Sequence, residues 1–182
     1  MLFNNLIYKD NVANDKFIDN KRIADKLNLP LIETKTNLHQ FYKKGLGFEQ
    51  THTLRNAVIP HVLSFKGIKF LYSSSFPLKD FAIKKWPDIG IVNSILLPLL
   101  STENTKLFEV GNEYGRVEKT KIISKMPETY DLLDICIDTK HLKSEYYNCS
   151  KCYKCMRALV TFEKLGIINN YQKMFGMGLQ KT

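Results

Sequence analysis

The chain has 182 residues, of which 44% are hydrophobic and 25% are charged, values typical of one soluble globular domain of ordinary size. Its longest apolar stretch, residues 89–100, contains Asn93 and Pro98 and is too short to cross a bilayer, so we expect no membrane partner. The formal net charge of +9 favours anionic partners such as nucleotides or RNA, but the charge is scattered along the chain and does not choose among them.

In the first half of the chain, short apolar runs alternate with segments in which apolar residues recur at the helical period. The runs predict strands at residues 2–8, 31–36 and 68–72. Between the first two strands we expect a helix capped by Asn14 or Asp15, which makes one strand–helix–strand unit of parallel type. A second helix is predicted at residues 53–65, kinked or delayed by Pro60 and ended by Gly67.

The second half of the chain continues this alternation. Helices are predicted at residues 92–100, 116–126 and 154–165, and strands at residues 106–110 and 132–137. Pro127 closes the middle helix, and Gly166 follows the last one, as helix C-termini prefer. A short amphipathic segment at residues 168–175 completes the C-terminal helices, residues 154–176. The alternation predicts a single α/β domain over residues 1–182, with an open, mainly parallel sheet and helices on both of its faces.

All four cysteines of the chain lie in one pattern, C-x12-C-x2-C-x2-C, formed by Cys136, Cys149, Cys152 and Cys155. Each two-residue gap turns the backbone tightly enough for both flanking sulfurs to face inward around one cation. Zinc takes four such ligands in a tetrahedron, and a site without an open position is structural rather than catalytic. The pattern therefore predicts one zinc ion that connects a strand to a helix across the loop of residues 136–155.

Three other interpretations of the cysteines stay open. Disulfides need an oxidising compartment, whereas residues 1–5 show no basic start followed by a long apolar core, so we expect a cytoplasmic protein. An iron–sulfur cluster also takes four thiolates, although its usual cysteine spacings differ. Four unrelated buried thiols would not explain why three of them lie within seven residues. The histidines show no metal-like spacing, and we expect His52 and His61 to be structural or surface groups.

Residues 148–157, which read Asn-Cys-Ser-Lys-Cys-Tyr-Lys-Cys-Met-Arg, resemble the zinc loop of the 7-cyano-7-deazaguanine synthases of queuosine biosynthesis and their relatives. These enzymes belong to the PP-loop ATP pyrophosphatase superfamily. Residues 54–56 (Leu-Arg-Asn) and 116–119 (Arg-Val-Glu-Lys), each at the head of a predicted helix, support the resemblance. A branch found beside polysaccharide and natural-product genes is closer in detail, because it shares both the Arg-Val-Glu-Lys stretch and the cysteine ending. The resemblance spans roughly residues 2–166 and implies an adenine nucleotide alpha hydrolase-like fold.

One departure from the family concerns its ATP site. The family binds pyrophosphate with a Ser-Gly-Gly-x-Asp-Ser loop after the first strand, where backbone N–H groups at a helix N-terminus hold the phosphates. This sequence contains no such loop, and residues 2–8 look like the family's second strand. The fold is therefore expected to be incomplete at its N-terminus, with the first strand, loop and helix before Met1 or in another polypeptide. Since that strand is central in the family, we expect an unusually paired strand edge, managed by a homodimer or a partner chain.

The resemblance implies an ATP-dependent C–N ligase that activates a small carboxylate by adenylation, so that a nitrogen nucleophile can attack it. Arg55, Ser73 and Ser74 would lie near the nucleotide, because open parallel sheets bind ligands at the carboxyl ends of their strands. Arg116 and Lys119 would neutralise phosphate or developing charge. Serine runs are also common in plain loops, and these two cations also suit a solvated first helical turn.

Two functions are consistent with these features. The first is the C-terminal part of such an enzyme, which by itself binds ATP weakly and does not turn it over. The alternative is a non-catalytic, zinc-containing α/β module that binds a nucleotide, RNA or a protein partner. The absent phosphate loop is the feature that separates the two.

Overall fold

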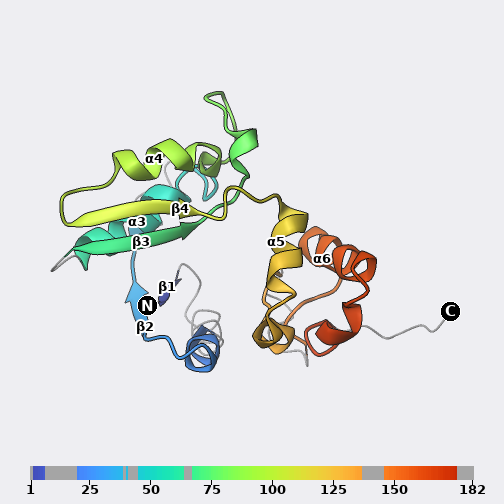
Figure 1. Ribbon diagram of the computed structural model, residues 1–182. Helices are drawn as coiled ribbons and strands as arrows, with labels where there is room; N and C mark the ends of the chain where they lie inside the picture. The colour runs from blue at the N-terminus through green and yellow to red at the C-terminus, as the bar shows by residue number, and fades with distance from the viewer. Residues whose placement is uncertain are drawn as a thin grey trace. The chain divides into compact units, whose positions relative to one another are not determined.

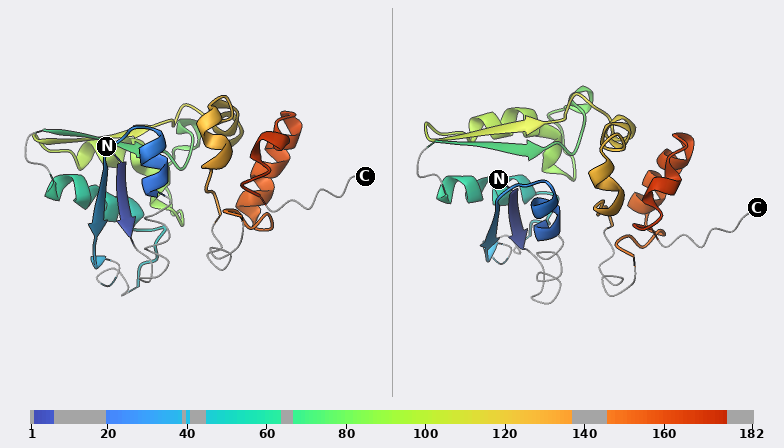
Figure 2. Two further views of the ribbon diagram at one scale, coloured as in Figure 1. Left: turned by 90° about the horizontal axis from the view of Figure 1, so that it is seen from below. Right: turned by 60° about the horizontal axis from the view of Figure 1, so that its bottom comes forward.

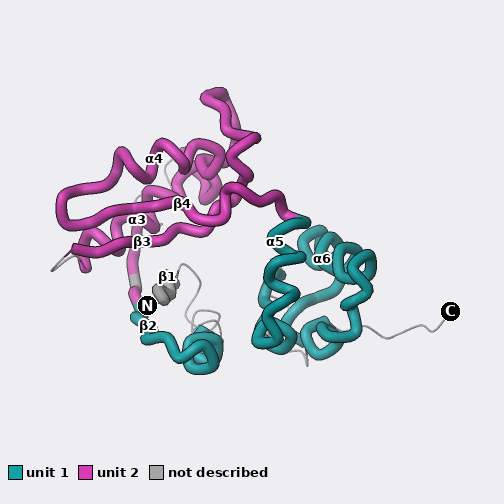
Figure 3. Tube along the Cα trace, viewed as in Figure 1, with its two compact units in different colours: residues 1–33, 117–182 teal, residues 34–116 magenta. Residues whose placement is uncertain are grey.

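The computed structural model of the chain describes residues 2–6, 20–38, 40, 45–63, 67–136 and 146–175. The chain forms two compact units, coloured separately in Figure 3: a terminal unit, Met1–Glu33 with Val117–Thr182, and a central unit, Thr34–Arg116. Whether the two units unfold as one cooperative domain stays a prediction. Within the described ranges, no helix combines the length and the apolar character needed to cross a membrane.

The central unit is built on a parallel pair of strands (Figure 1). Its main elements, in chain order, are α3 (His52–Val62), β3 (Ile68–Ser73), α4 (Asn93–Leu99) and β4 (Thr105–Val110), with two short 3-10 helices, η1 (Leu78–Asp80) and η2 (Ile89–Val92). The registered pair Leu71 and Phe108 lies in the middle of the ladder. Because parallel strands cannot be joined by a tight hairpin, the chain crosses over between them, and α4 lies in that crossover. The strands predicted at residues 68–72 and 106–110 are confirmed.

Both helices of the central unit pack on the same face of the strand pair. Ala57 of α3, Leu97 of α4 and Leu107 of β4 form its buried core. Side chains alternate between the faces of a strand, and those on the opposite face are exposed: Leu71 is 63% exposed and Phe108 is 44% exposed. The structure thus shows an α/β arrangement with a small parallel sheet, while helices on both faces of a larger sheet stay a prediction.

In the terminal unit, β1 (Leu2–Leu6) pairs with β2 (Leu31–Lys35) in a second two-stranded sheet, whose strands lie side by side in both views of Figure 2. Residues 20–26 between them are helical. The predicted order of strand, helix and strand is therefore confirmed. The predicted caps, Asn14 and Asp15, lie outside the described residues.

The other named elements of the terminal unit are helices. Its elements are α5 (Arg116–Ile123), which begins one residue before the unit, η3 (Pro127–Asp131), α6 (Tyr153–Lys164) and η5 (Ile168–Tyr171). α6 ends in a left-handed turn at Gly166, with φ of 69°. The Gly166 N–H donates to the Glu163 carbonyl, and the Ile167 N–H donates to the Phe162 carbonyl. These two hydrogen bonds are the ones that define a Schellman motif. This turn directs η5 back over α6, and the rings of Phe162 and Tyr171 stack with centroids 4.0 Å apart.

The strand predicted at residues 132–137 is wrong for its described part, because residues 133–136 form no strand. The backbone groups that a neighbouring strand would have bonded go to a side chain instead. The Asn148 amide nitrogen donates a hydrogen bond to the Leu133 carbonyl, and the Asn148 amide oxygen accepts one from the Ile135 N–H. Leu132 is thus buried, and Leu133 and Ile135 are partly buried, without belonging to a sheet. Ile137 lies outside the described residues. The helix predicted at residues 116–126 is also shorter, since α5 ends at Ile123.

Candidate metal centre

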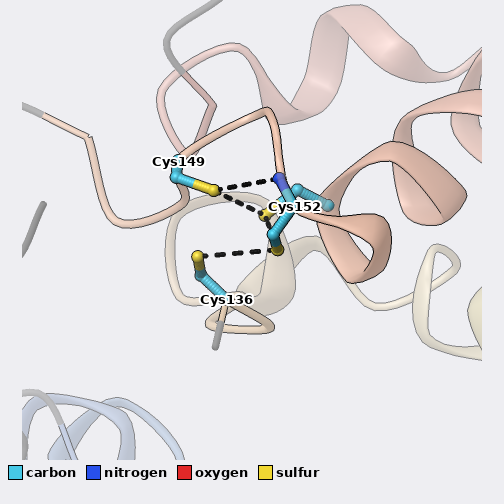
Figure 4. A group of neighbouring side chains, drawn as sticks. Cys136, Cys149 and Cys152 are labelled. Atoms are coloured by element: carbon cyan, nitrogen blue, oxygen red, sulfur yellow. Dashed lines mark hydrogen bonds between the residues drawn. The ribbon is translucent and has the colours of Figure 1, made fainter. Parts of the chain in front are cut away.

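Three of the four cysteines are brought together by one tight turn and the start of α6 (Figure 4). Ser150 adopts a left-handed conformation, with φ of 59°, so the chain reverses directly after Cys149. The Cys149 sulfur then accepts the Cys152 N–H at 3.2 Å and the Lys151 N–H at 3.5 Å. Cys152 is the residue before α6, and Cys155 lies in the first turn of the helix. The spacing therefore folds three sulfurs into one concave turn, as predicted.

Cys136 approaches this turn from a distant segment and completes the group. Its sulfur lies 3.8 Å from that of Cys152, while Cys149 and Cys155 are 3.9 Å apart and Cys152 and Cys155 are 3.4 Å apart. All four sulfurs lie within 4.8 Å of one another. A tetrahedron with metal–sulfur bonds of about 2.3 Å has edges of about 3.8 Å. The four cysteines therefore fit a single tetrahedral ion with little movement.

The sulfur geometry also bears on the other interpretations. A disulfide needs about 2.05 Å between sulfurs, and the cysteines of this group are free. A cluster of several iron atoms separates its thiolate ligands more widely than one ion does, so four sulfurs within 4.8 Å favour a single ion. Burial of one member and partial burial of the other three argue against four unrelated thiols. Zinc and a single iron ion both suit four thiolates in a tetrahedron.

The environment shifts the pKa values of two of the thiols in opposite directions. Burial acts to raise the pKa of Cys149, but the Lys151 and Cys152 N–H groups that point at its sulfur lower that pKa below the ordinary value. For Cys155, which is fully buried, burial and the contact with the Cys152 thiol raise the pKa strongly. A divalent cation favours the thiolate form of its ligands, so an ion at the centre would offset the cost of ionising Cys155 in this buried position.

Asn148 connects the two segments that carry the ligands. Its side chain is 1% exposed. The amide nitrogen donates to the Leu133 carbonyl at 2.7 Å and to the Met174 carbonyl at 3.1 Å, and the amide oxygen accepts the Ile135 N–H at 3.0 Å. Its own N–H donates to the Met174 carbonyl at 3.0 Å. The sequence pattern indicates Asn148 only through the resemblance, and its contacts become visible only in the structure.

The four cysteines adjoin an apolar cluster of the terminal unit. Cys155 belongs to the cluster itself, and Cys136, Cys149 and Cys152 pack against it. Its buried members are Cys155, Ala158, Leu159, Phe162, Tyr171, Met174 and Phe175. The side chains below the cysteines come from α6 and from the segment after it. An ion bound here would therefore fix the position of the core as well as that of the loop.

The remaining candidate residues are distributed over both units. In the central unit, Ser73 ends β3 and is exposed, Ser74 is 7% exposed and its N–H bonds to the Val110 carbonyl, and Arg55 is 5% exposed. Arg116 is exposed, and its Nη2 donates to the Ser75 carbonyl at 3.3 Å. The structure thus brings Arg116 to the serine segment, whereas Lys119 lies on α5 in the terminal unit.

A buried polar cluster in the central unit was not predicted as a group. The ring of His52 in α3 is placed between two oxygens: Nδ1 is 2.8 Å from the Tyr72 hydroxyl and Nε2 is 2.9 Å from Asp88 Oδ1. The Asn56 amide also donates to the Tyr72 hydroxyl, at 3.1 Å. Burial raises the pKa of Tyr72 more than the hydrogen bond from Asn56 lowers it. His52, Tyr72 and Asp88 are far apart in sequence, so no local pattern could have grouped them.

The His52 cluster has the properties of a structural connection, because it joins α3, β3 and the loop before η2. Both ring nitrogens of His52 are engaged and its exposed fraction is 7%. We expect His52→Ala to lower the free energy of unfolding by about 2–3 kcal/mol, since it removes a buried ring together with two hydrogen bonds. Urea denaturation measures this, with His61→Ala on the same helix as the control, expected to cost less than about 1 kcal/mol. Equal losses for the two variants would contradict the structural role.

Comparison of the chain with protein-family models, with curated proteins and with solved structures finds no match. Its function therefore has to be inferred from its own residues.

Proposed function

We propose that the chain binds one structural Zn²⁺ ion through Cys136, Cys149, Cys152 and Cys155. The observation that carries this proposal is the grouping of all four sulfurs within 4.8 Å, at distances that suit a tetrahedron of thiolates. The donor set is closed: four protein sulfurs leave no position for water or substrate. The zinc ion would contribute to folding and not to bond-breaking chemistry.

The ion would tie the segment before α6 to the helix itself. Cys136 follows η3, and Cys155 lies in the first turn of α6. Because metal ions bind the folded arrangement of ligands, the free energy of binding adds to the free energy of folding. In the terminal unit, the ion would act as a cross-link beside the buried apolar cluster.

Elemental analysis of protein purified without added metal tests this proposal. We expect one zinc per chain for the parent protein, and a loss of most of that zinc for Cys152→Ser. The Cys152 sulfur lies next to those of both Cys136 and Cys155, so this variant removes the central ligand of the group, whereas loss of Cys136 leaves the three thiolates of the turn in place. Lys151→Ala, which changes an exposed side chain between two ligands, is the matched control and should retain one zinc. Iron in place of zinc, or no metal in the parent protein, would contradict the proposal.

At the level of the whole protein, we propose that this zinc-bearing chain is part of an ATP-dependent, carboxylate-activating enzyme of the 7-cyano-7-deazaguanine synthase type. The support is the cysteine loop together with a parallel strand pair that has Ser73 at its carboxyl end and Arg116 bonded to the adjoining Ser75. In the reaction, a carboxylate oxygen attacks the α-phosphorus of ATP and pyrophosphate leaves. A nitrogen nucleophile then attacks the acyl adenylate and releases AMP. Arg116 and Lys119 would stabilise the charge that develops on the phosphates.

The phosphate loop and a further strand would come from polypeptide outside this sequence, either continuous with it or on a partner chain. Two separate two-stranded sheets, β1–β2 and β3–β4, support this arrangement. Each strand of a two-stranded sheet is an edge strand, and in a larger sheet further strands bond to such edges. The complete sheet would then have the adenine nucleotide alpha hydrolase-like order.

A second candidate function, a non-catalytic zinc module, is favoured by one observation. Arg55, which the resemblance places near the nucleotide, is 5% exposed and therefore packed within the central unit. In such a module the zinc centre would still organise the terminal unit, and a nucleotide, RNA or protein partner would bind elsewhere on the chain. The ATP measurements described in the Discussion separate the two candidates.

A further inference from the structure

We propose that Asn148 sets the coordination number of the metal, by holding Cys136 in place as the fourth ligand. This inference rests on the proposed zinc site and adds a positioning residue to it. Without Asn148, the ion would be held by Cys149, Cys152 and Cys155 alone, with one position open.

The hydrogen bonds of Asn148 reach both sides of the metal loop. Asn148 is the residue before Cys149, and two of its side-chain bonds are made to Leu133 and Ile135, in the segment that ends at Cys136. The side chain therefore fastens the backbone one residue before each of two ligands. Its third bond, to the Met174 carbonyl, anchors the pair to the buried C-terminal part of the apolar cluster.

The four ligands differ in how much support they have without Asn148. Cys149, Cys152 and Cys155 are placed by a single turn of backbone, by N–H groups that point at the Cys149 sulfur and by the start of α6. Cys136 is thirteen positions upstream and its segment is not part of a sheet. The Leu133 N–H donates to Thr129 within its own segment, whereas the bonds of the Leu133 carbonyl and the Ile135 N–H to Asn148 join this segment to the turn that carries the other three cysteines. Loss of those bonds should release Cys136 first.

An isosteric substitution isolates the hydrogen bonds from the packing. Asn148→Asp keeps the shape and volume of the side chain but replaces its donor by an oxygen. That oxygen would face the carbonyls of Leu133 and Met174, which are acceptors and cannot donate. Asn148→Ala removes the side chain altogether and serves as the second variant. Met174→Ala is the matched control, because it removes a buried side chain of the same cluster and keeps the backbone carbonyl that Asn148 uses.

The test is cobalt(II) substitution, followed by the sulfur-to-cobalt charge-transfer absorption per bound ion. We expect the parent protein and Met174→Ala to give a four-thiolate spectrum. Asn148→Asp and Asn148→Ala should give about three-quarters of that intensity, equal to the spectrum of Cys136→Ala, since three of four thiolates remain. Their zinc affinity should fall about 10- to 100-fold, the range typical for the loss of a group that orients a ligand.

Alkylation of the zinc-loaded proteins measures directly whether Cys136 is protected by the metal. Mass spectrometry should find all four cysteines protected in the parent protein, and Cys136 modified ahead of the other three in both Asn148 variants. Four-thiolate spectra with unchanged zinc affinity in these variants would overturn the inference. So would variants that bind no cobalt, or that are alkylated equally at all four cysteines, because the remaining three thiolates are expected to keep the ion. A parent protein without a four-thiolate spectrum would instead contradict the zinc site itself.

Discussion

Removal of the zinc is expected to unfold the core of the terminal unit, and Cys152→Ser is expected to have the same effect. Cys155, Phe162 and Tyr171 are fully buried in the cluster on which the metal centre rests, so the ligands cannot separate without exposing it. Structural zinc contributes roughly 10–16 kcal/mol in small zinc-binding peptides, which is as large as the whole stability of a typical domain, about 5–15 kcal/mol. The loss of α6 and η5 should be visible as a drop in helical circular dichroism after chelation.

The location of this unfolding distinguishes a specific effect from general destabilisation. Hydrogen exchange should become fast at Phe162 and the rest of α6, while the amides of the β3–β4 pair in the central unit keep their protection. Lys151→Ala should behave as the parent protein in the same measurement. If a chelated protein keeps protected amides in α6, the metal is not needed for this core and the structural role of the centre is wrong.

The chain by itself is expected to bind ATP weakly and to release no pyrophosphate. A triphosphate is held and activated by a dense set of inward N–H donors together with positive charge, and the loop that supplies those donors in the resembled family is not in this sequence. Arg116 can attract phosphate, but one cation on a long side chain does not replace a preorganised loop. Titration calorimetry with ATP and a pyrophosphate-release assay measure both quantities.

The proposed enzyme function predicts turnover of ATP when a polypeptide carrying the Ser-Gly-Gly-x-Asp-Ser loop is joined to the chain or bound to it. In that complex we expect Arg116→Ala to lower turnover by about 100-fold, the order typical for removal of one group that stabilises developing charge. Lys121→Ala, on the same helix and also exposed, is the control and should change turnover less than about twofold. Tight ATP binding or clear turnover by the chain alone would show that the phosphate site is rebuilt from other residues, with residues 73–75 the first place to examine.

Sequence patterns predicted the elements whose signals are local. β3, β4, α3, α4 and α6 follow from apolar alternation or helical periodicity, and each lies close to its predicted range. The prediction of a strand at residues 132–137 was wrong because it depended on a contact that is not local. An apolar run indicates burial, but a strand also needs a partner strand, and here the Asn148 side chain makes hydrogen bonds to the backbone of the segment instead. A run of this length cannot by itself distinguish a strand from another buried segment.

The sequence by itself indicated which cysteines lie together, because three thiols within seven residues can converge through one turn of backbone. Only the tertiary structure decided how the fourth ligand arrives and which polar groups are buried together. Cys136 reaches the others through hydrogen bonds between Asn148, the segment before Cys136 and the C-terminal part of the cluster. His52, Tyr72 and Asp88 meet in the same way, from α3, β3 and the loop before η2. Such contacts depend on which distant segments pack against one another, and the spacing of residues along the sequence does not determine that packing.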